Sequence, residues 1–129
     1  MTSKPNKPIM LFDCKTSQNI IGQDKFLKAF ENILNHGAYC QGPETKELDE
    51  KLAAYSGVKY CSTCGSGTDA LTLALMAWGV KEGDAVFVSS FTFVASAEAP
   101  VLLGATPIFV DSDPDTYNMD PEDLQRAID

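Results

Sequence analysis

The 129-residue chain is 44% hydrophobic and 22% charged, a composition typical of one soluble globular unit. Its formal net charge of −8 argues against nucleic acid and anionic membranes as partners, because an acidic surface does not attract polyanions. No apolar run resembles a signal peptide or a membrane-spanning helix, which predicts a cytoplasmic protein.

The chain begins with a predicted leader and entry segment, residues 1–22, whose first eight residues are polar and whose remainder shows no clear periodicity. An amphipathic helix is predicted over residues 23–35. Its apolar side chains fall on one stripe: Phe26, Leu27, Phe30, Ile33 and Leu34. Gly37 suits a left-handed cap, and His36 is interpreted as a helix-end residue rather than a metal ligand.

Helices and strands alternate in the rest of the chain. A helix is predicted from Pro43 to about residue 55, with Leu48, Leu52 and Tyr55 facing inward. Predicted strands cover residues 58–63, 85–89 and 106–110, and predicted helices cover residues 68–78, 95–103 and the stretch from Asp120 onward. The strand 85–89 lacks polar alternation, which suits a parallel sheet covered by helices on both faces. The sequence therefore predicts an α/β fold in which the nearly all-apolar helix 68–78 is buried between layers.

A glycine-containing turn, residues 65–71 (GSGTDAL), joins the first predicted strand to an apolar helix. The free N–H groups and the positive dipole end of that helix make a binding site for an anion such as a phosphate, and Thr68 can add a hydroxyl donor. Ligands of parallel sheets bind beyond the carboxyl ends of the strands. Those ends also carry residues 89–93 and Asp111, so we expect all three segments at one edge.

A dinucleotide is one candidate ligand, because residues 65–70 match the pattern G-x-G-x-x-A. Such a site needs an acidic residue about 20 positions further on to hold a ribose hydroxyl. Ser89 and Ser90 stand there instead, and no acid follows until Glu98. The lysine of a Walker A loop is also missing, so both nucleotide-binding patterns are incomplete.

Cys61 and Cys64 form a C-x-x-C pair, which can be half of a zinc site or a redox pair. No second ligand pair accompanies them, and a glycine turn follows where a redox motif would begin a helix. We favour two small residues packed near a strand end. All four cysteines are expected to be free thiols, and no metal site is predicted.

Several ordered motifs resemble the pyridoxal-phosphate (PLP) dependent nucleotide-sugar aminotransferases of the DegT/StrS type, which have fold type I. They are residues 66–71 (SGTDAL), 90–96 (SFTFVAS) and 104–111 (GATPIFVD), supported by residues 41–43, 55–58 and 115–120. The similarity spans about residues 20–129. The resemblance makes residues 23–129 an incomplete N-terminal part of the PLP-binding large domain. Ser89 and Ser96 depart from the usual proline and threonine.

The resemblance implies the roles of four residues. Gly67, Thr68 and Asp69 correspond to the turn that holds the PLP phosphate, and Phe93 corresponds to the aromatic residue stacked on the pyridine ring. Without the resemblance, a core aromatic would be the favoured interpretation of Phe93, as it remains for Phe91.

Asp111 has two interpretations, a loop or cap carboxylate and, less favoured, a group that takes part directly in chemistry. In the family this aspartate is not the acid that pairs with the pyridine nitrogen. The run of aspartates over residues 111–115 superficially resembles a calcium loop. It lacks the required glycine and distal glutamate, so a calcium site is discounted.

The resemblance implies transfer of an amino group, typically from glutamate, to a keto group of a nucleotide-linked sugar by a homodimer. No lysine of this chain lies in a motif like that of the Schiff-base lysine. In the family order of strands, strand 58–63 would also lack sheet neighbours, so we expect the stretch to be the front of a larger enzyme. The alternatives are a lysine-less sensor or regulatory binding module of the same family and, less favoured, a Rossmann-type oxidoreductase.

Overall fold

A computed structural model describes residues 10–129 of the chain; residues 1–9, most of the predicted polar leader, lie outside that range. The chain forms two compact units, Met1–Gly57 and Val58–Asp129. The prediction that residues 23–129 belong to one incomplete domain stays a prediction. Among the helices of the described chain, none has both the length and the apolar character that a membrane crossing requires.

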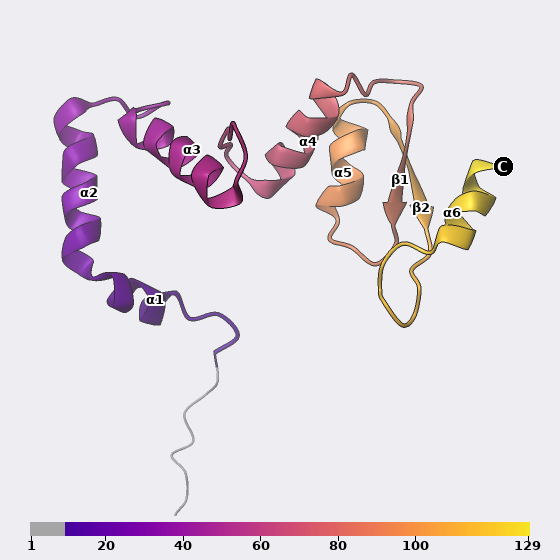
Figure 1. Ribbon diagram of the computed structural model, residues 1–129, viewed down its shortest axis with the longest axis horizontal. Coiled ribbons are helices and arrows are strands. Elements are labelled where there is room, and N and C mark those ends of the chain that lie inside the picture. Colours follow the sequence, from indigo (N-terminus) through magenta and orange to yellow (C-terminus); the bar gives the residue numbers. More distant parts are fainter. Residues whose placement is uncertain (1–9) are drawn as a thin grey trace, which may run out of the picture. The chain divides into compact units, whose positions relative to one another are not determined.

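The first unit contains three helices (Figure 1): α1 (Cys14–Ile21), α2 (Gln23–His36) and α3 (Pro43–Ser56). Helix α1 was not predicted, because it is only eight residues long and no periodicity was recognised over so short a stretch. The Asp13 carboxylate stabilises its first turn by accepting hydrogen bonds from the Thr16 hydroxyl at 2.6 Å and the Thr16 N–H at 3.0 Å. Those bonds hold the pKa of Asp13 below its usual range.

Helices α2 and α3 confirm the predicted elements to within a residue or two. Gly37 caps α2 in the left-handed conformation with φ of 67°, and Pro43 lies in the first turn of α3. His36 ends α2, as predicted, and its Nε2 lies 2.9 Å from Glu44 Oε1. The inward orientation predicted for Leu48, Leu52 and Tyr55 of α3 was wrong for the described chain, because all three are exposed. Most of the apolar stripe of α2 is exposed as well: Phe26, Leu27, Phe30 and Leu34.

The second unit confirms the predicted α/β fold. Its elements are α4 (Gly67–Ala77), β1 (Ala85–Ser89), α5 (Ala95–Leu102), β2 (Thr106–Val110) and α6 (Pro121–Ile128). The two strands are parallel, in a register that pairs Ala85 with Thr106 and Ser89 with Val110. Helices α5 and α6 both contact β2, and Figure 1 shows them on opposite sides of the strands. The small core consists of Val88, Ala95, Ala99, Pro100, Ala105 and Val110.

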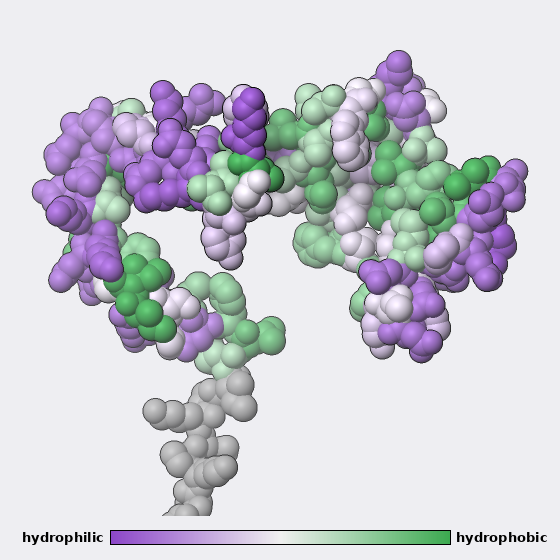
Figure 2. All heavy atoms as spheres, viewed as in Figure 1, coloured by the Kyte–Doolittle hydropathy of each residue, from purple (hydrophilic) through white to green (hydrophobic). Residues whose placement is uncertain are grey.

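Two expectations about the start of this unit were wrong. Residues 58–63 do not form the predicted strand. The expectation that they would lack sheet neighbours is confirmed for the part of the chain that the structure describes, and without a partner the segment is not a strand. Helix α4 packs along one side against α5 but is not buried between layers, since Leu71, Leu73 and Met76 are exposed. Figure 2 shows apolar residues on the visible face over α4, α5 and the strands.

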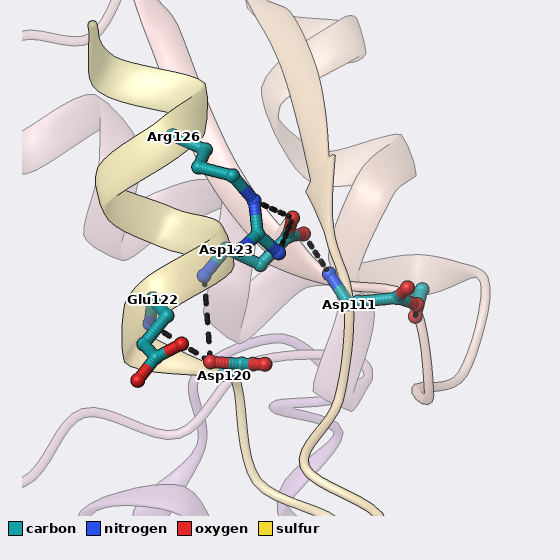
Figure 3. Close-up of polar contacts among 6 residues, drawn as sticks. Asp111, Asp120, Glu122, Asp123 and Arg126 are labelled. Carbon is teal, nitrogen blue, oxygen red and sulfur yellow. Dashed lines mark hydrogen bonds and ion pairs between the residues drawn. The ribbon is translucent and has the colours of Figure 1, made fainter.

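Carboxylates attach α6 to the end of β2 (Figure 3). Asp120 caps the helix by accepting from the N–H groups of Glu122 and Asp123 at 2.8 and 3.4 Å. The Asp123 carboxylate accepts from the Asp111 N–H at 2.7 Å and from Arg126 Nη2 at 2.8 Å. The Asp111 hydrogen bond and then the guanidinium lower the pKa of Asp123. Figure 3 shows the Asp111 side chain pointing away from this cluster.

Candidate cofactor-phosphate site

The glycine turn lies where the sequence places it, at the start of α4. Ser66 is the N-cap of the helix: its Oγ accepts from the Asp69 N–H at 3.1 Å, and its carbonyl oxygen accepts from the Ala70 N–H at 3.1 Å. The N–H groups of Gly67 and Thr68 have no acceptor among residues 10–129. Two free donors therefore remain at the positive end of the helix dipole.

A cavity of about 440 Å³ opens beside these donors. Its walls come from the first turns of α4 and α5 and from the segment before α5: Gly67, Thr68, Leu71, Phe93, Ala95 and Ser96. The Phe93 side chain is 74% exposed, so its ring is available to a ligand, and the alternative of a core aromatic was wrong for the described chain. The arrangement combines N–H donors, two hydroxyls and one open aromatic ring.

Three of the four predicted cofactor-binding residues, Gly67, Thr68 and Phe93, thus line one cavity. Asp69 lines a neighbouring cavity with Cys64, Gly65, Thr72 and Leu73, and its N–H is already bonded to the Ser66 cap. A direct role for Asp69 at the cofactor stays a prediction. Its carboxylate lies so near the turn that a Cβ added to Gly65 would come within 2.9 Å of Oδ2.

The sequence indicated only that Ser96 stands where the family usually has threonine, and it predicted no role for this residue in the site. In the structure it lines the cavity, and its Oγ lies 2.8 Å from Thr92 Oγ1. The backbone N–H of Ser96 donates to the Phe93 carbonyl oxygen at 3.0 Å. The one available signal was its position in the first turn of a helix that follows a strand end, where a small hydroxyl residue can face a ligand.

The carboxyl ends of β1 and β2 meet at one edge, as predicted. Ser90 Oγ donates to Asp111 Oδ1 at 3.3 Å, and Ser89 Oγ lies 2.8 Å from Ser112 Oγ. Asp111 is therefore a loop carboxylate bonded to the segment after β1, which agrees with the favoured interpretation. Phe91 was wrongly expected in the core: it is 69% exposed and contacts Tyr117.

The C-x-x-C pair lies in the extended segment before α4, with Cys61 half-buried and Cys64 exposed. Cys64 Sγ donates to the Ser66 carbonyl oxygen at 3.2 Å. The expected packing of both cysteines near a strand end was wrong, because the strand does not form. Within residues 10–129, no cluster of three or more His, Cys, Asp or Glu side chains is arranged to hold a metal.

The chain matches the model of the DegT/DnrJ/EryC1/StrS aminotransferase family over residues 21–129. It is 48% identical over 120 residues to UDP-2-acetamido-2-deoxy-3-oxo-D-glucuronate aminotransferase from Pseudomonas aeruginosa, a match that covers 93% of this chain and 33% of the relative.

Solved structures are similar as well. A DegT DnrJ EryC1 StrS aminotransferase from Brucella abortus superposes with a TM-score of 0.83 at 42% identity, covering 92% of this chain and 31% of that one. The PLP-form of Spr1654 from Streptococcus pneumoniae superposes with a TM-score of 0.76 at 34% identity, covering 81% and 27%. This chain thus spans about a third of the length of the Pseudomonas relative.

Proposed function

Because the chain belongs to the DegT/DnrJ/EryC1/StrS aminotransferase family, we propose that it is the cofactor-phosphate-binding part of a PLP-dependent aminotransferase. The observation that carries the proposal is the shared cavity of Gly67, Thr68 and Phe93 beside two N–H groups that lack an acceptor among the described residues. The proposed substrates are an amino-acid donor, typically glutamate, and a nucleotide-linked keto sugar. The sugar is supported by the name of the Pseudomonas relative.

The residues of the cavity fit a phosphorylated aromatic cofactor. The N–H groups of Gly67 and Thr68 would donate to phosphate oxygens, the Thr68 hydroxyl would add a third donor, and the dipole of α4 favours the negative charge. A Cβ added to Gly67 meets no other atom within 4 Å, so space remains beside the turn. Phe93 offers an open ring face for stacking, which contributes about 0.5–1.5 kcal/mol beyond burial.

PLP, when bound, supplies an electron sink that lets an amino group leave one substrate and join another. In the proposal this chain holds and orients the cofactor. The lysine that reacts with it, and the acid that pairs with its pyridine nitrogen, would lie in a part of the protein that this chain does not span, as the family resemblance implies. A homodimer is proposed on the family resemblance, and a cytoplasmic location is proposed on the sequence, whose apolar runs resemble neither a signal peptide nor a membrane helix.

Reduction with borohydride tests the proposal on the complete protein. We expect incubation with PLP, reduction and peptide mass spectrometry to find a pyridoxyl group on one specific lysine outside the 129 residues. Release of 2-oxoglutarate from glutamate in the presence of a nucleotide-linked keto sugar should accompany it.

PLP binding without a covalent lysine product would contradict the transferase and favour the sensor or regulatory module. Tight binding of a dinucleotide without PLP binding would favour the oxidoreductase. A pyridoxyl group on one specific lysine within residues 1–129 would contradict the assignment of chemistry to another part of the protein.

A further inference from the structure

The loop between β2 and α6, residues 111–119, is fixed by its own hydrogen bonds. Asp113 Oδ1 accepts from the Thr116 N–H at 2.7 Å, the Thr116 hydroxyl at 2.9 Å and the Asp115 N–H at 3.0 Å. The Asp113 N–H donates to the Asn118 carbonyl oxygen at 2.9 Å, and Ser112 pairs with Met119 in an antiparallel bridge. These contacts give the loop one defined path, and those to Thr116 and Asp115 lower the pKa of Asp113.

Tyr117 sits in this loop in a conformation that a bulky residue rarely adopts. Its φ is +62°, in the left-handed region, and its N–H donates to the Asp113 carbonyl oxygen at 2.8 Å. Such a backbone is strained for a bulky side chain and persists only where the surrounding structure fixes it. A glycine or asparagine would adopt it with less strain, so the tyrosine ring itself calls for an explanation.

The ring of Tyr117 contacts the segment that follows β1. Its centroid lies 5.6 Å from that of Phe91 at an interplanar angle of 40°, within the range of favourable aromatic pairs. The Ser89–Ser112 and Ser90–Asp111 hydrogen bonds join the same two segments. The loop therefore fixes the backbone at Phe91, two residues before Phe93. After Phe93, the hydrogen bond from the Ser96 N–H to the Phe93 carbonyl oxygen fixes the backbone.

We infer that Tyr117 is a positioning residue: through Phe91 it sets the path of residues 90–93 and thereby holds the Phe93 ring at the cofactor cavity. The inference rests on the proposed function, because it assigns Tyr117 a role toward the cofactor that Phe93 stacks on. Tyr117 is not among the residues that line the Phe93 cavity, so its effect passes through the Phe91 contact.

A double-mutant cycle on the complete protein tests the inference, with the PLP dissociation constant and the induced circular dichroism of the cofactor band as readouts. We expect Tyr117→Ala to raise the dissociation constant severalfold and to reduce the induced signal, because the ring plane is no longer fixed. Tyr117→Phe keeps the ring and should stay within twofold of the wild type. In the Phe93→Ala background, Tyr117→Ala should have little further effect, because both act through one ring.

A further pair of variants separates positioning from loss of the fold. Asp113→Asn keeps an amide oxygen that can accept the bonds of the loop, and Asp113→Ala does not. We expect the first to retain cofactor affinity and the second to behave like Tyr117→Ala. All variants are compared at temperatures where thermal unfolding shows the protein to be folded.

The inference is overturned if Tyr117→Ala leaves both readouts unchanged, if it lowers only the thermal midpoint, or if its effect adds fully to that of Phe93→Ala. The outcomes for the proposed function are separate. If Phe93→Ala lowers affinity and Tyr117→Ala does not, the inference fails and the proposed cofactor site stands. If neither Phe93→Ala nor Tyr117→Ala changes PLP affinity, both the positioning role of Tyr117 and the stacking role of Phe93 are contradicted.

Discussion

At the scale of residues, Gly67 is where stability and binding should respond differently to one change. It opens α4 with a φ outside the left-handed region, and an added Cβ meets no atom within 4 Å, so an alanine fits. Alanine also favours a helix over glycine by up to about 1 kcal/mol. The Cβ, however, would occupy space beside the donors that we assign to the phosphate.

We therefore expect Gly67→Ala to unfold at the same or a slightly higher urea concentration than the wild type while binding PLP more weakly. Equilibrium unfolding without cofactor and a PLP titration measure the two effects separately. Gly65→Ala is a second probe: its Cβ would displace the Asp69 carboxylate without entering the Phe93 cavity, so its effect on PLP affinity tests the predicted cofactor role of Asp69 separately. Unchanged PLP affinity in Gly67→Ala would contradict the assigned position of the phosphate.

Residue types and spacing were enough to predict an anion-binding turn at Gly67 and Thr68 and to expect residues 89–93 at the same edge, whereas the role of Phe93 came only from the family resemblance. The Phe91–Tyr117 contact could not be predicted in this way. It joins residues far apart in sequence, and it depends on the left-handed backbone of Tyr117, which tyrosine does not favour.

At the scale of elements, the attachment of α6 to β2 should depend on pH. The Asp111 N–H and the Arg126 guanidinium lower the pKa of Asp123 in the folded protein, so the unfolded state binds a proton more readily. The stabilisation is therefore fully present above the ordinary aspartate pKa, near 3.8, and is lost as the pH falls through the lower folded value.

We expect Asp123→Asn to be less stable than the wild type at pH 6, with a difference that narrows as the pH falls below about 4. Urea unfolding of both proteins across this pH range measures the difference. Glu122→Gln, one position away, serves as control because the Glu122 side chain makes no hydrogen bond within the described chain. A difference in the free energy of unfolding between the wild type and Asp123→Asn that stays constant with pH would contradict the role of the Asp123 charge.

Elements with a strong local signal were predicted closely: β1 and β2 agree residue for residue, and α2, α3, α5 and α6 agree at their starts. The errors have physical causes. Residues 58–63 have the composition of a strand, but a strand requires a partner to pair its N–H and C=O groups. Helix α1 is only eight residues long and begins at the Asp13 cap, so its sequence offers too short a stretch for the helical pattern to be recognised.

At the scale of the whole molecule, the exposed apolar side chains agree with a chain that spans about a third of its relatives' length. The exposed stripe of α2 in the first unit and the exposed side of α4 in the second have the apolar character typical of buried faces. We propose that the part of the protein corresponding to the rest of the relatives covers them, as it supplies the reacting lysine.

The central claim is that the first turn of α4 holds the phosphate of PLP, and two threonines of that helix allow a matched test. Thr68 lines the Phe93 cavity, whereas Thr72, one turn later, does not and donates its hydroxyl to the Thr68 carbonyl oxygen at 3.0 Å. A hydrogen bond to a charged group contributes about 1.5–3 kcal/mol. In the complete protein we therefore predict that Thr68→Val raises the PLP dissociation constant about tenfold or more, and that Thr72→Val changes it less than about threefold. Equal dissociation constants for Thr68→Val and the wild type would contradict the claim.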